Sequence, residues 1–203
     1  MQNERVLQTP LKEADVAELK LGDLVCLSGE VVTTAGLPTH QRLIQCIEKG
    51  QKPPIDMEHA AFLQMGSYIR ERNGRFEILY INPTTSTRFN PYMPTIIRAF
   101  KLRAVGGKGG LDAQSVQAMK ETGCVYLSFL GAGCPLLSAA IRDVIAIEWR
   151  DLVSHYRLAN FRVDRLGPAV VAIDAHGNSL YENISSEMAK ENDREKQTAV
   201  TSS

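Results

Sequence analysis

The residues best suited to chemistry gather between positions 82 and 111, where hydroxyls, an arginine, a lysine and several glycines separate apolar runs. Thr84, Thr85 and Arg88 follow a run rich in β-branched and aromatic residues, which is typical of a strand. Lys108 follows a second, shorter apolar run. Guanidinium, ammonium and hydroxyl groups at the ends of strands are suited to hold a carboxylate or phosphate. The stretch therefore predicts a site for a small anion.

Two loops carry these groups: the threonine loop, Thr84–Arg88, and the glycine loop, Gly106–Gly110. A helix is expected to begin at Asn90-Pro91, so that its unpaired amides face the threonine loop. Open α/β sheets bind ligands at the ends of neighbouring parallel strands, where both loops are expected to lie. Neither loop has a nucleotide fingerprint, because Lys108 is not followed by Ser or Thr and no G-x-G-x-x-G opens a helix. Taken singly, each loop has the alternative of forming only turns and caps.

The alternation of apolar runs with turn signals indicates an α/β fold with a mixed sheet. Asn73-Gly74 predicts a hairpin, and the first third of the chain is interpreted as mainly antiparallel. The rest, up to residue 149, is typical of successive βαβ units, with one helix capped by Asp112 and ended by Gly123. Strands are expected at 24–32, 60–65, 76–81, 102–105, 124–130, 143–149 and 169–174, with Leu180-Tyr181 closing the sheet. Helices are expected at 14–20, 39–48, 91–100, 113–122 and 135–141.

Length and charge limit the class of protein. The chain has 203 residues, which we divide into one domain at 1–184 and a charged, flexible C-terminal tail at 185–203. Lys+Arg and Asp+Glu both number 23, and the zero net charge argues against a general nucleic-acid or membrane surface. No apolar run approaches the roughly 20 residues that span a bilayer, and the polar N-terminus has no signal-peptide core. We expect a cytoplasmic protein.

The four cysteines contain no C-x-x-C pair and lie in or beside apolar runs, so neither a disulfide framework nor a zinc site is expected. Cys134, at a strand-to-helix junction, is either a thiol activated by a helix N-terminus or a buried structural thiol. The structural interpretation is favoured. No metal ligands are predicted in this chain.

Five motifs occur in an order and spacing that resemble a known family. They are Gly22-Asp23 leading into Leu27-Ser28-Gly29, HQRL at 40–43, NPTTSTR at 82–88, GGKGG at 106–110 and DAHGN at 174–178. Over roughly residues 8 to 184 the chain resembles the β subunit of L(+)-tartrate dehydratase and the C-terminal domain of class I, iron–sulfur fumarases. The resemblance implies a swivelling β/β/α domain with a mixed or barrel-like β layer and packed helices. That domain is related in form to the mobile domain of aconitase-like enzymes.

The resemblance also implies an activity: the β subunit of a hydro-lyase that adds water to, or removes it from, a small dicarboxylate of fumarate, malate or tartrate type. Family members use a [4Fe-4S] cluster as a Lewis acid, and cysteines of a partner α subunit are expected to hold it. This chain has no cluster-ligand spacing, so it is expected to bind no cofactor and to be inactive alone. We expect a homodimer alone and α2β2 when assembled, with no nucleic acid or membrane as partner.

The family's site residues carry over to matching positions. Thr84 matches the threonine taken as the catalytic base, and Arg88, Lys108 and Thr85 are assigned to substrate binding. Arg88 can hold a carboxylate through two parallel hydrogen bonds, while Lys108 adds a point charge. An aliphatic hydroxyl does not ionise unaided near neutral pH, so cations and amides must lower its pKa. The alternative is that Thr84 caps the helix and an acid of the partner takes the proton.

One part of the family pattern is missing. Many relatives carry Arg-Asp in the loop before the histidine that matches His40, where the arginine binds a substrate carboxylate, but this chain has Ala35–Pro38. Arg42, His40 or a partner residue replaces that clamp, or the substrate differs at this end. For His40 itself, substrate binding and loop anchoring are equally open.

Two other functions compete with the lyase subunit. One is a non-catalytic anion- or nucleotide-binding module that uses the threonine and glycine loops, and the other is a purely structural regulatory domain. The missing phosphate fingerprint and ribose-binding acid count against the first. The convergence of Arg88 and Lys108 on a glycine loop counts against the second.

Overall fold

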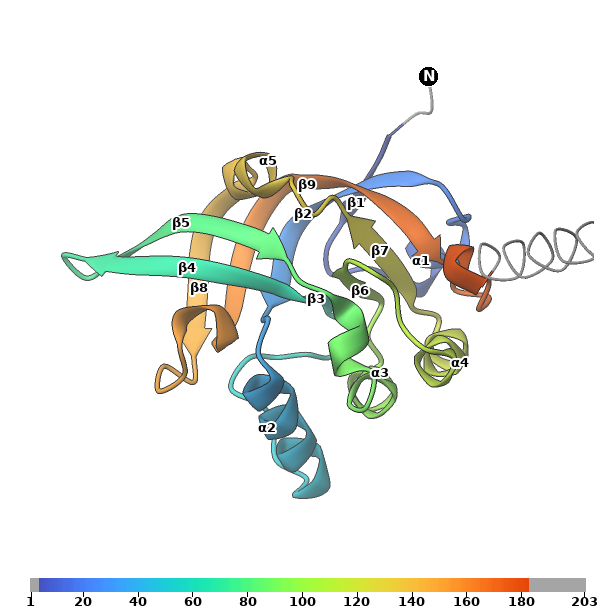
Figure 1. The fold of residues 1–203 in the computed structure, drawn as a ribbon, viewed down its shortest axis with the longest axis horizontal. Coiled ribbons are helices and arrows are strands. Elements are labelled where there is room, and N and C mark those ends of the chain that lie inside the picture. The colour runs from blue at the N-terminus through green and yellow to red at the C-terminus, as the bar shows by residue number, and fades with distance from the viewer. Residues whose placement is uncertain (1–3, 183–203) are drawn as a thin grey trace, which may run out of the picture.

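The computed structural model describes residues 4–182, and its centre is a closed barrel of five strands within a seven-stranded sheet (Figure 1). The sheet order is β1-β2-β3-β6-β7-β9-β8, and an additional pairing of β2 with β9 closes the ring. The barrel strands are β2 (Leu24–Thr33), β3 (Ala61–Leu63), β6 (Ala104–Gly107), β7 (Val125–Phe129) and β9 (Leu158–Ile173). The outer strands are β1 (Arg5–Gln8) and β8 (Ile141–Glu148). The predicted mixed α/β fold with a barrel-like β layer is confirmed.

Strand direction is mostly parallel. β1, β2, β3, β6 and β7 are parallel to one another, and β9 returns antiparallel between β7 and β2. The expectation of a mainly antiparallel first third is therefore wrong. The expectation that a βαβ unit ends at β8 is also wrong. Such a unit needs parallel strands, whereas β8 pairs antiparallel with β9. A hydrophobic pattern reports which faces of a strand are buried but does not identify its partner.

Helices cover one side of the barrel, where α2, α3 and α4 lie together (Figure 1). Asp112 accepts a hydrogen bond from the Ser115 amide at 2.9 Å and starts α4, and Gly123 ends it in the left-handed conformation, as predicted. The α-helices are α1 (Glu13–Ala17), α2 (Leu37–Glu48), α3 (Met93–Phe100), α4 (Ala113–Thr122) and α5 (Cys134–Ala139). Short 3-10 helices are η1 (Ser86–Phe89) and η2 (Ser154–Tyr156). Within residues 4–182 no helix has the length and apolar character that a membrane crossing needs.

Two apolar cores lie on the two faces of the barrel wall. Successive residues of a strand point to opposite faces, so Leu63 and Leu127 belong to one core while Phe62 and Tyr126 belong to the other. The second core also contains the buried sides of α3 and α4. Packing on both faces holds the ends of β6 and β7 in fixed positions.

The hairpin β4–β5 projects from the barrel and forms a sheet of its own (Figure 1). β4 (Met65–Arg72) and β5 (Arg75–Pro83) pair around Asn73-Gly74, both with positive φ, so the predicted hairpin is confirmed. Within the described chain β5 pairs with β4 alone, so the expected βαβ unit that begins with this strand is absent. β5 instead returns the chain to the barrel, where Thr85 forms an isolated parallel bridge with Lys108.

The helix expected from Asn90-Pro91 begins later, at Met93 of α3, because η1 comes first. The Asn90 side chain does not cap that helix; it accepts a hydrogen bond from the Asp112 amide at 3.2 Å. The second half of the threonine loop is therefore itself part of η1, and α3 begins only at Met93.

The end of the described chain also differs from expectation. Leu180-Tyr181 lie in a helical segment rather than a strand, and Ser179 instead makes an isolated antiparallel bridge with Ile173. The tail predicted at 185–203 lies outside the described residues.

Gly107, the last residue of β6, lies where the glycine and threonine loops touch. A β-carbon on Gly107 would lie 2.2 Å from the Ser86 hydroxyl oxygen and 3.2 Å from the Thr84 carbonyl oxygen. A β-carbon on Gly106 would lie 2.7 Å from a methyl carbon of Leu63. In the fold these glycines make room for neighbouring protein atoms.

Gly107→Ala should therefore lower the free energy of unfolding by about 2 kcal/mol, the usual scale for overpacking a buried site. Urea denaturation measures this change. The matched control is Gly131→Ala, because a β-carbon there would lie at an ordinary 3.6 Å from Lys108 Cδ. We expect the control to stay within about 0.5 kcal/mol of the wild type. If Gly107→Ala is no less stable than the control, the two loops are not in this contact.

Candidate active site

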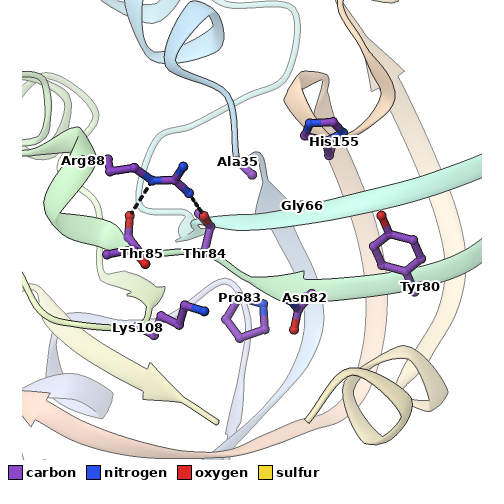
Figure 2. Close-up of a pocket in the computed structure, with 10 residues that line it drawn as sticks. All are labelled: Ala35, Gly66, Tyr80, Asn82, Pro83, Thr84, Thr85, Arg88, Lys108 and His155. Atoms are coloured by element: carbon purple, nitrogen blue, oxygen red, sulfur yellow. Dashed lines mark hydrogen bonds between the residues drawn. The ribbon is translucent and has the colours of Figure 1, made fainter. Parts of the chain in front are cut away.

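A pocket of about 490 Å³ opens where the threonine loop, the end of β5 and the η2 turn come together (Figure 2). Arg88, Thr84, Thr85 and Lys108 lie on one side of it, and Tyr80 and His155 lie on the other. The full lining is Ala35, Gly66, Tyr80, Asn82, Pro83, Thr84, Thr85, Arg88, Lys108 and His155. Four of the five site residues that the sequence predicts thus lie around one cavity.

Backbone hydrogen bonds hold the two loops side by side. The Ser86 amide donates to the Lys108 carbonyl at 2.8 Å, and the Lys108 amide donates to the Thr84 carbonyl at 3.0 Å. The Thr84 amide donates to the Gln64 carbonyl at 2.9 Å, just beyond the end of β3. The predicted meeting of the two loops is therefore formed, although β5 and β6 are not neighbours in one sheet.

Arg88 lies over the threonine loop and contacts it directly. One guanidinium NH₂ donates a hydrogen bond to Thr84 Oγ1, and Nε donates to the Thr85 carbonyl oxygen at 3.5 Å (Figure 2). The guanidinium carbon also lies 5.8 Å from the centre of the Phe89 ring. Arg88 is exposed, so an incoming anion can reach it.

Neither cation of the pocket has a carboxylate partner in the described chain. Most other arginines of the fold are paired with Asp or Glu, whereas Arg88 and Lys108 make no ion pair with a residue of 4–182. Two uncompensated positive charges beside hydroxyl groups favour the binding of a small anion.

A buried hydrogen bond fixes the threonine loop to the barrel. Ser86 Oγ lies 2.7 Å from the Tyr126 hydroxyl oxygen of β7, and both side chains are fully buried. Burial raises the pKa of Tyr126 well above its usual range, and the hydrogen bond with Ser86 lowers it by a smaller amount. Tyr126 is therefore a neutral, positioning residue beneath the pocket.

His40 lies on α2 and is not among the residues that line the pocket. The side chain is fully buried, its Nδ1 lies 2.7 Å from the Gly36 carbonyl oxygen, and its ring stacks on Phe89 with 4.0 Å between centroids. Burial lowers the pKa of His40 to about 4, so the ring is neutral near pH 7. Of the two roles that the sequence leaves open, this arrangement favours loop anchoring.

Arg42 is likewise held away from the pocket lining. Its guanidinium makes two hydrogen bonds to the Asp151 carboxylate, at 2.9 and 2.5 Å, and lies 5.8 Å from the Trp149 ring centre. The pair holds the pKa of the Asp151 carboxyl below its usual range. Arg42 is therefore already engaged.

Two lining side chains, Tyr80 and His155, are missed by the sequence reasoning. Tyr80 lies in an alternating strand, where an aromatic residue is expected to pack rather than to face a ligand. His155 lies in a turn for which no motif is predicted. Only their position in the fold identifies these two residues, because they lie 75 positions apart in the chain and line the same pocket.

No group of three His, Cys, Asp or Glu side chains within residues 4–182 is placed to hold a metal ion. The cysteines are free; Cys26 and Cys124 are buried, and Cys46 and Cys134 are partly buried. Burial and the neighbouring Glu4 raise the pKa of Cys26 to about 12. These thiols belong to the packing rather than to the pocket.

The fold and the pocket together define an α/β barrel domain with an open pocket that is lined by two cations and by hydroxyl groups. Residues 2–184 match the family model described as "Fumarase C-terminus". This chain belongs to that family.

Curated relatives agree with the family assignment. The putative L(+)-tartrate dehydratase subunit beta of Methanocaldococcus jannaschii is 30% identical over 175 residues, which cover 86% of this chain and 89% of the relative. The L(+)-tartrate dehydratase subunit beta of Escherichia coli is 30% identical over 178 residues, covering 87% and 86%. A putative class I fumarate hydratase of Geobacillus stearothermophilus is 34% identical over 187 residues, but these cover only 34% of that longer protein.

The buried His40 predicts a specific pH dependence. Between about pH 4 and 6.5 the unfolded chain protonates this histidine and the folded chain does not, so the free energy of unfolding should rise with pH across that window. The pKa difference corresponds to on the order of 3 kcal/mol, lost as the pH falls through the window. Chemical denaturation at several pH values measures the slope.

Two substitutions isolate the residue. His40→Asn removes the titrating group and should flatten the slope, whereas His59→Asn replaces a partly exposed histidine and should leave it unchanged. Equal slopes in all three proteins would mean that His40 titrates normally in the folded state.

Proposed function

We propose that this chain is the substrate-binding β subunit of an iron–sulfur hydro-lyase that reversibly adds or removes water from a small dicarboxylate. The observation that carries the proposal is the convergence of Thr84, Arg88 and Lys108 on one open pocket in a chain of this family. The names of the relatives, which are tartrate dehydratase β subunits and a class I fumarate hydratase, support a hydro-lyase of fumarate, malate or tartrate type.

In this proposal Arg88 and Lys108 neutralise one carboxylate of the substrate. Arg88 can approach a carboxylate with two parallel N–H donors and so fix its orientation, and Lys108 adds charge without fixed geometry. The Thr85 hydroxyl, beside both, supplies a further neutral donor. Neither Arg88 nor Lys108 forms an ion pair with a residue of 4–182, so both cations are available to bind the carboxylate.

In the same proposal, Thr84 takes the carbon-bound proton. Arg88 donates to Thr84 Oγ1, and a donor to an oxygen stabilises its anionic form relative to the hydroxyl form. The same contact also suits a Thr84 that only organises the loop, which is the alternative role. Distinguishing the two roles requires a measurement of the proton transfer itself.

The proposal places the [4Fe-4S] cluster on a partner α subunit, where it would act as a Lewis acid toward the substrate hydroxyl. Exposed apolar side chains near the pocket support a docked partner. Tyr80 lines the pocket and is 42% exposed, and Leu130, which precedes the Gly131 backbone beside Lys108, is 68% exposed. Exposed apolar groups around a polar site are typical of an interaction surface.

The proposed assembly is a homodimer in isolation and α2β2 with the α subunit. A cytoplasmic location belongs to the same proposal and is supported by four free cysteines, because reducing compartments keep thiols unpaired. The nucleotide-binding alternative is not favoured, because the family and the missing phosphate fingerprint both argue against it.

Activity should require the partner. The chain purified alone and free of metal should show no hydration of fumarate or dehydration of malate or tartrate. Co-expression with its α subunit under anaerobic conditions, followed by cluster loading, should give turnover of at least one of these substrates. Turnover by the isolated chain, or an assembled and loaded complex that turns over none of them, would contradict the proposal.

Comparison of Thr84→Ser with Thr84→Ala in the assembled enzyme separates the two roles of Thr84. Ser keeps the hydroxyl, whereas Ala removes it, so Ala should lower kcat by roughly 100-fold or more if Thr84 is the base. Stability should fall by only about 1 kcal/mol, as for one lost side-chain hydrogen bond, here the bond from Arg88. The deciding measurement is exchange of the substrate's carbon-bound hydrogen with solvent. If Thr84→Ala exchanges this hydrogen as fast as the wild type, another group takes the proton.

A further inference from the structure

The loop that lacks the family's Arg-Asp pair is attached to the η2 turn. The Ala35 amide donates to the His155 carbonyl at 3.0 Å, and the Thr34 hydroxyl donates to the Tyr156 carbonyl at 3.0 Å. The Thr39 hydroxyl contacts the same Tyr156 carbonyl. These bonds hold η2 against the start of α2, at the edge of the pocket.

Small residues make this attachment possible. A β-carbon on Gly36 would lie 2.6 Å from Tyr156 Cβ, so no other residue fits at this position without moving η2. A β-carbon on Gly66 would lie 3.2 Å from both Ala35 Cβ and His155 Cβ. These small side chains allow the η2 turn to lie against the pocket wall.

The result is an imidazole on the side of the pocket opposite Lys108 and Arg88 (Figure 2). The His155 ring packs edge-on against Tyr156, with 4.4 Å between centroids, and is exposed. The ring forms no hydrogen bond or ion pair with another residue of 4–182. The Tyr80 hydroxyl lies on the same side, on a ring that stacks against Tyr68 with 6.0 Å between centroids.

The other candidates for this role are excluded by their contacts. Arg42 is engaged in a two-fold hydrogen-bonded pair with Asp151, and His40 is buried with its Nδ1 on the Gly36 carbonyl. Neither lines the pocket. A dicarboxylate whose first carboxylate lies on Arg88 and Lys108 therefore has the side-chain donors of His155, Tyr80 and Asn82 for its second end. Of these three, His155 and Tyr80 lie on the side of the pocket opposite Arg88 and Lys108.

We propose that His155, assisted by Tyr80, binds the second carboxylate of the substrate and so determines specificity for dicarboxylates over monocarboxylates. The inference rests on the proposed function and names the residue that stands in for the missing arginine. A single imidazole N–H and a phenol O–H replace a guanidinium fork, so this end is held by separate donors of adjustable position.

A pair of ligands tests this assignment. Succinate and butyrate have the same chain length and differ in the second carboxylate, so the ratio of their inhibition constants in the assembled enzyme reports that group alone. His155→Ala should raise the inhibition constant of succinate by about 10-fold or more, as for a lost hydrogen bond to a charged group. It should raise the inhibition constant of butyrate by less than about twofold. His155→Asn keeps an N–H donor and should recover most of the succinate affinity. Tyr80→Phe should raise the inhibition constant of succinate by a smaller factor than His155→Ala does.

A merely structural His155 gives a different result. If His155 only packs the η2 turn, its loss would weaken the binding of succinate and of butyrate by similar factors. His155→Asn would then not restore the difference between the two inhibition constants. Equal weakening of succinate and butyrate, or no weakening of succinate, overturns the assignment. His59→Asn serves as the control, because His59 lies outside the pocket and should leave both constants unchanged.

Succinate and butyrate also distinguish a failure of the His155 assignment from a failure of the hydro-lyase proposal. Nuclear magnetic resonance titration of the full chain with succinate and butyrate measures binding without turnover. If the assembled enzyme is inactive while His155→Ala selectively weakens succinate, the proposed reaction fails and the binding role stands. If the enzyme is active and His155→Ala weakens both ligands equally, the reaction stands and the role of His155 fails.

Discussion

The pocket depends on one backbone contact, the parallel pairing of the threonine loop with the end of β6. Two hydrogen bonds between Thr84–Ser86 and Lys108 place the hydroxyls and the two cations on a common surface. Gly107 permits this approach because a β-carbon there would overlap Ser86. Since Ser86 is in turn bonded to the buried Tyr126 of β7, the position of the loops is set by the barrel core rather than by the loops themselves. Binding groups held in this way lose little entropy when a ligand arrives.

The positive charge of the pocket follows from the lack of carboxylate partners for Arg88 and Lys108 within residues 4–182. About half of the acidic side chains in residues 4–182 pair with arginines, while none of them pairs with Arg88 or Lys108. The contact from Arg88 to Thr84 Oγ1 links anion binding to the state of that hydroxyl, because the same guanidinium serves both. In the proposed function, a substrate carboxylate that draws Arg88 toward itself would also change the charge felt at Thr84. Binding and proton transfer would then be coupled through one side chain.

The opposite wall of the pocket is built by close packing of small residues against the η2 turn. Small residues at 35, 36 and 66 admit the η2 turn, and the turn presents His155 at the site. The pocket that results is open, with apolar side chains exposed near its mouth. An open polar site of this kind suits a subunit that supplies one half of an active site, with the remaining wall supplied by a partner.

The sequence by itself determined most of the elements and several of the residues that line the pocket. Local signals such as Asn73-Gly74, Asp112 and Gly123 act within a few residues, so the hairpin turn and the limits of α4 were predictable. The motifs likewise selected Thr84, Arg88 and Lys108, which the fold brings to one pocket. Strand direction, the separation of β4–β5 from the barrel and the burial of His40 were decided only by the tertiary structure. The same holds for His155, whose place in the pocket depends on residues more than a hundred positions away. Long-range pairing and close packing leave no local trace in a sequence, because they depend on which distant segments meet.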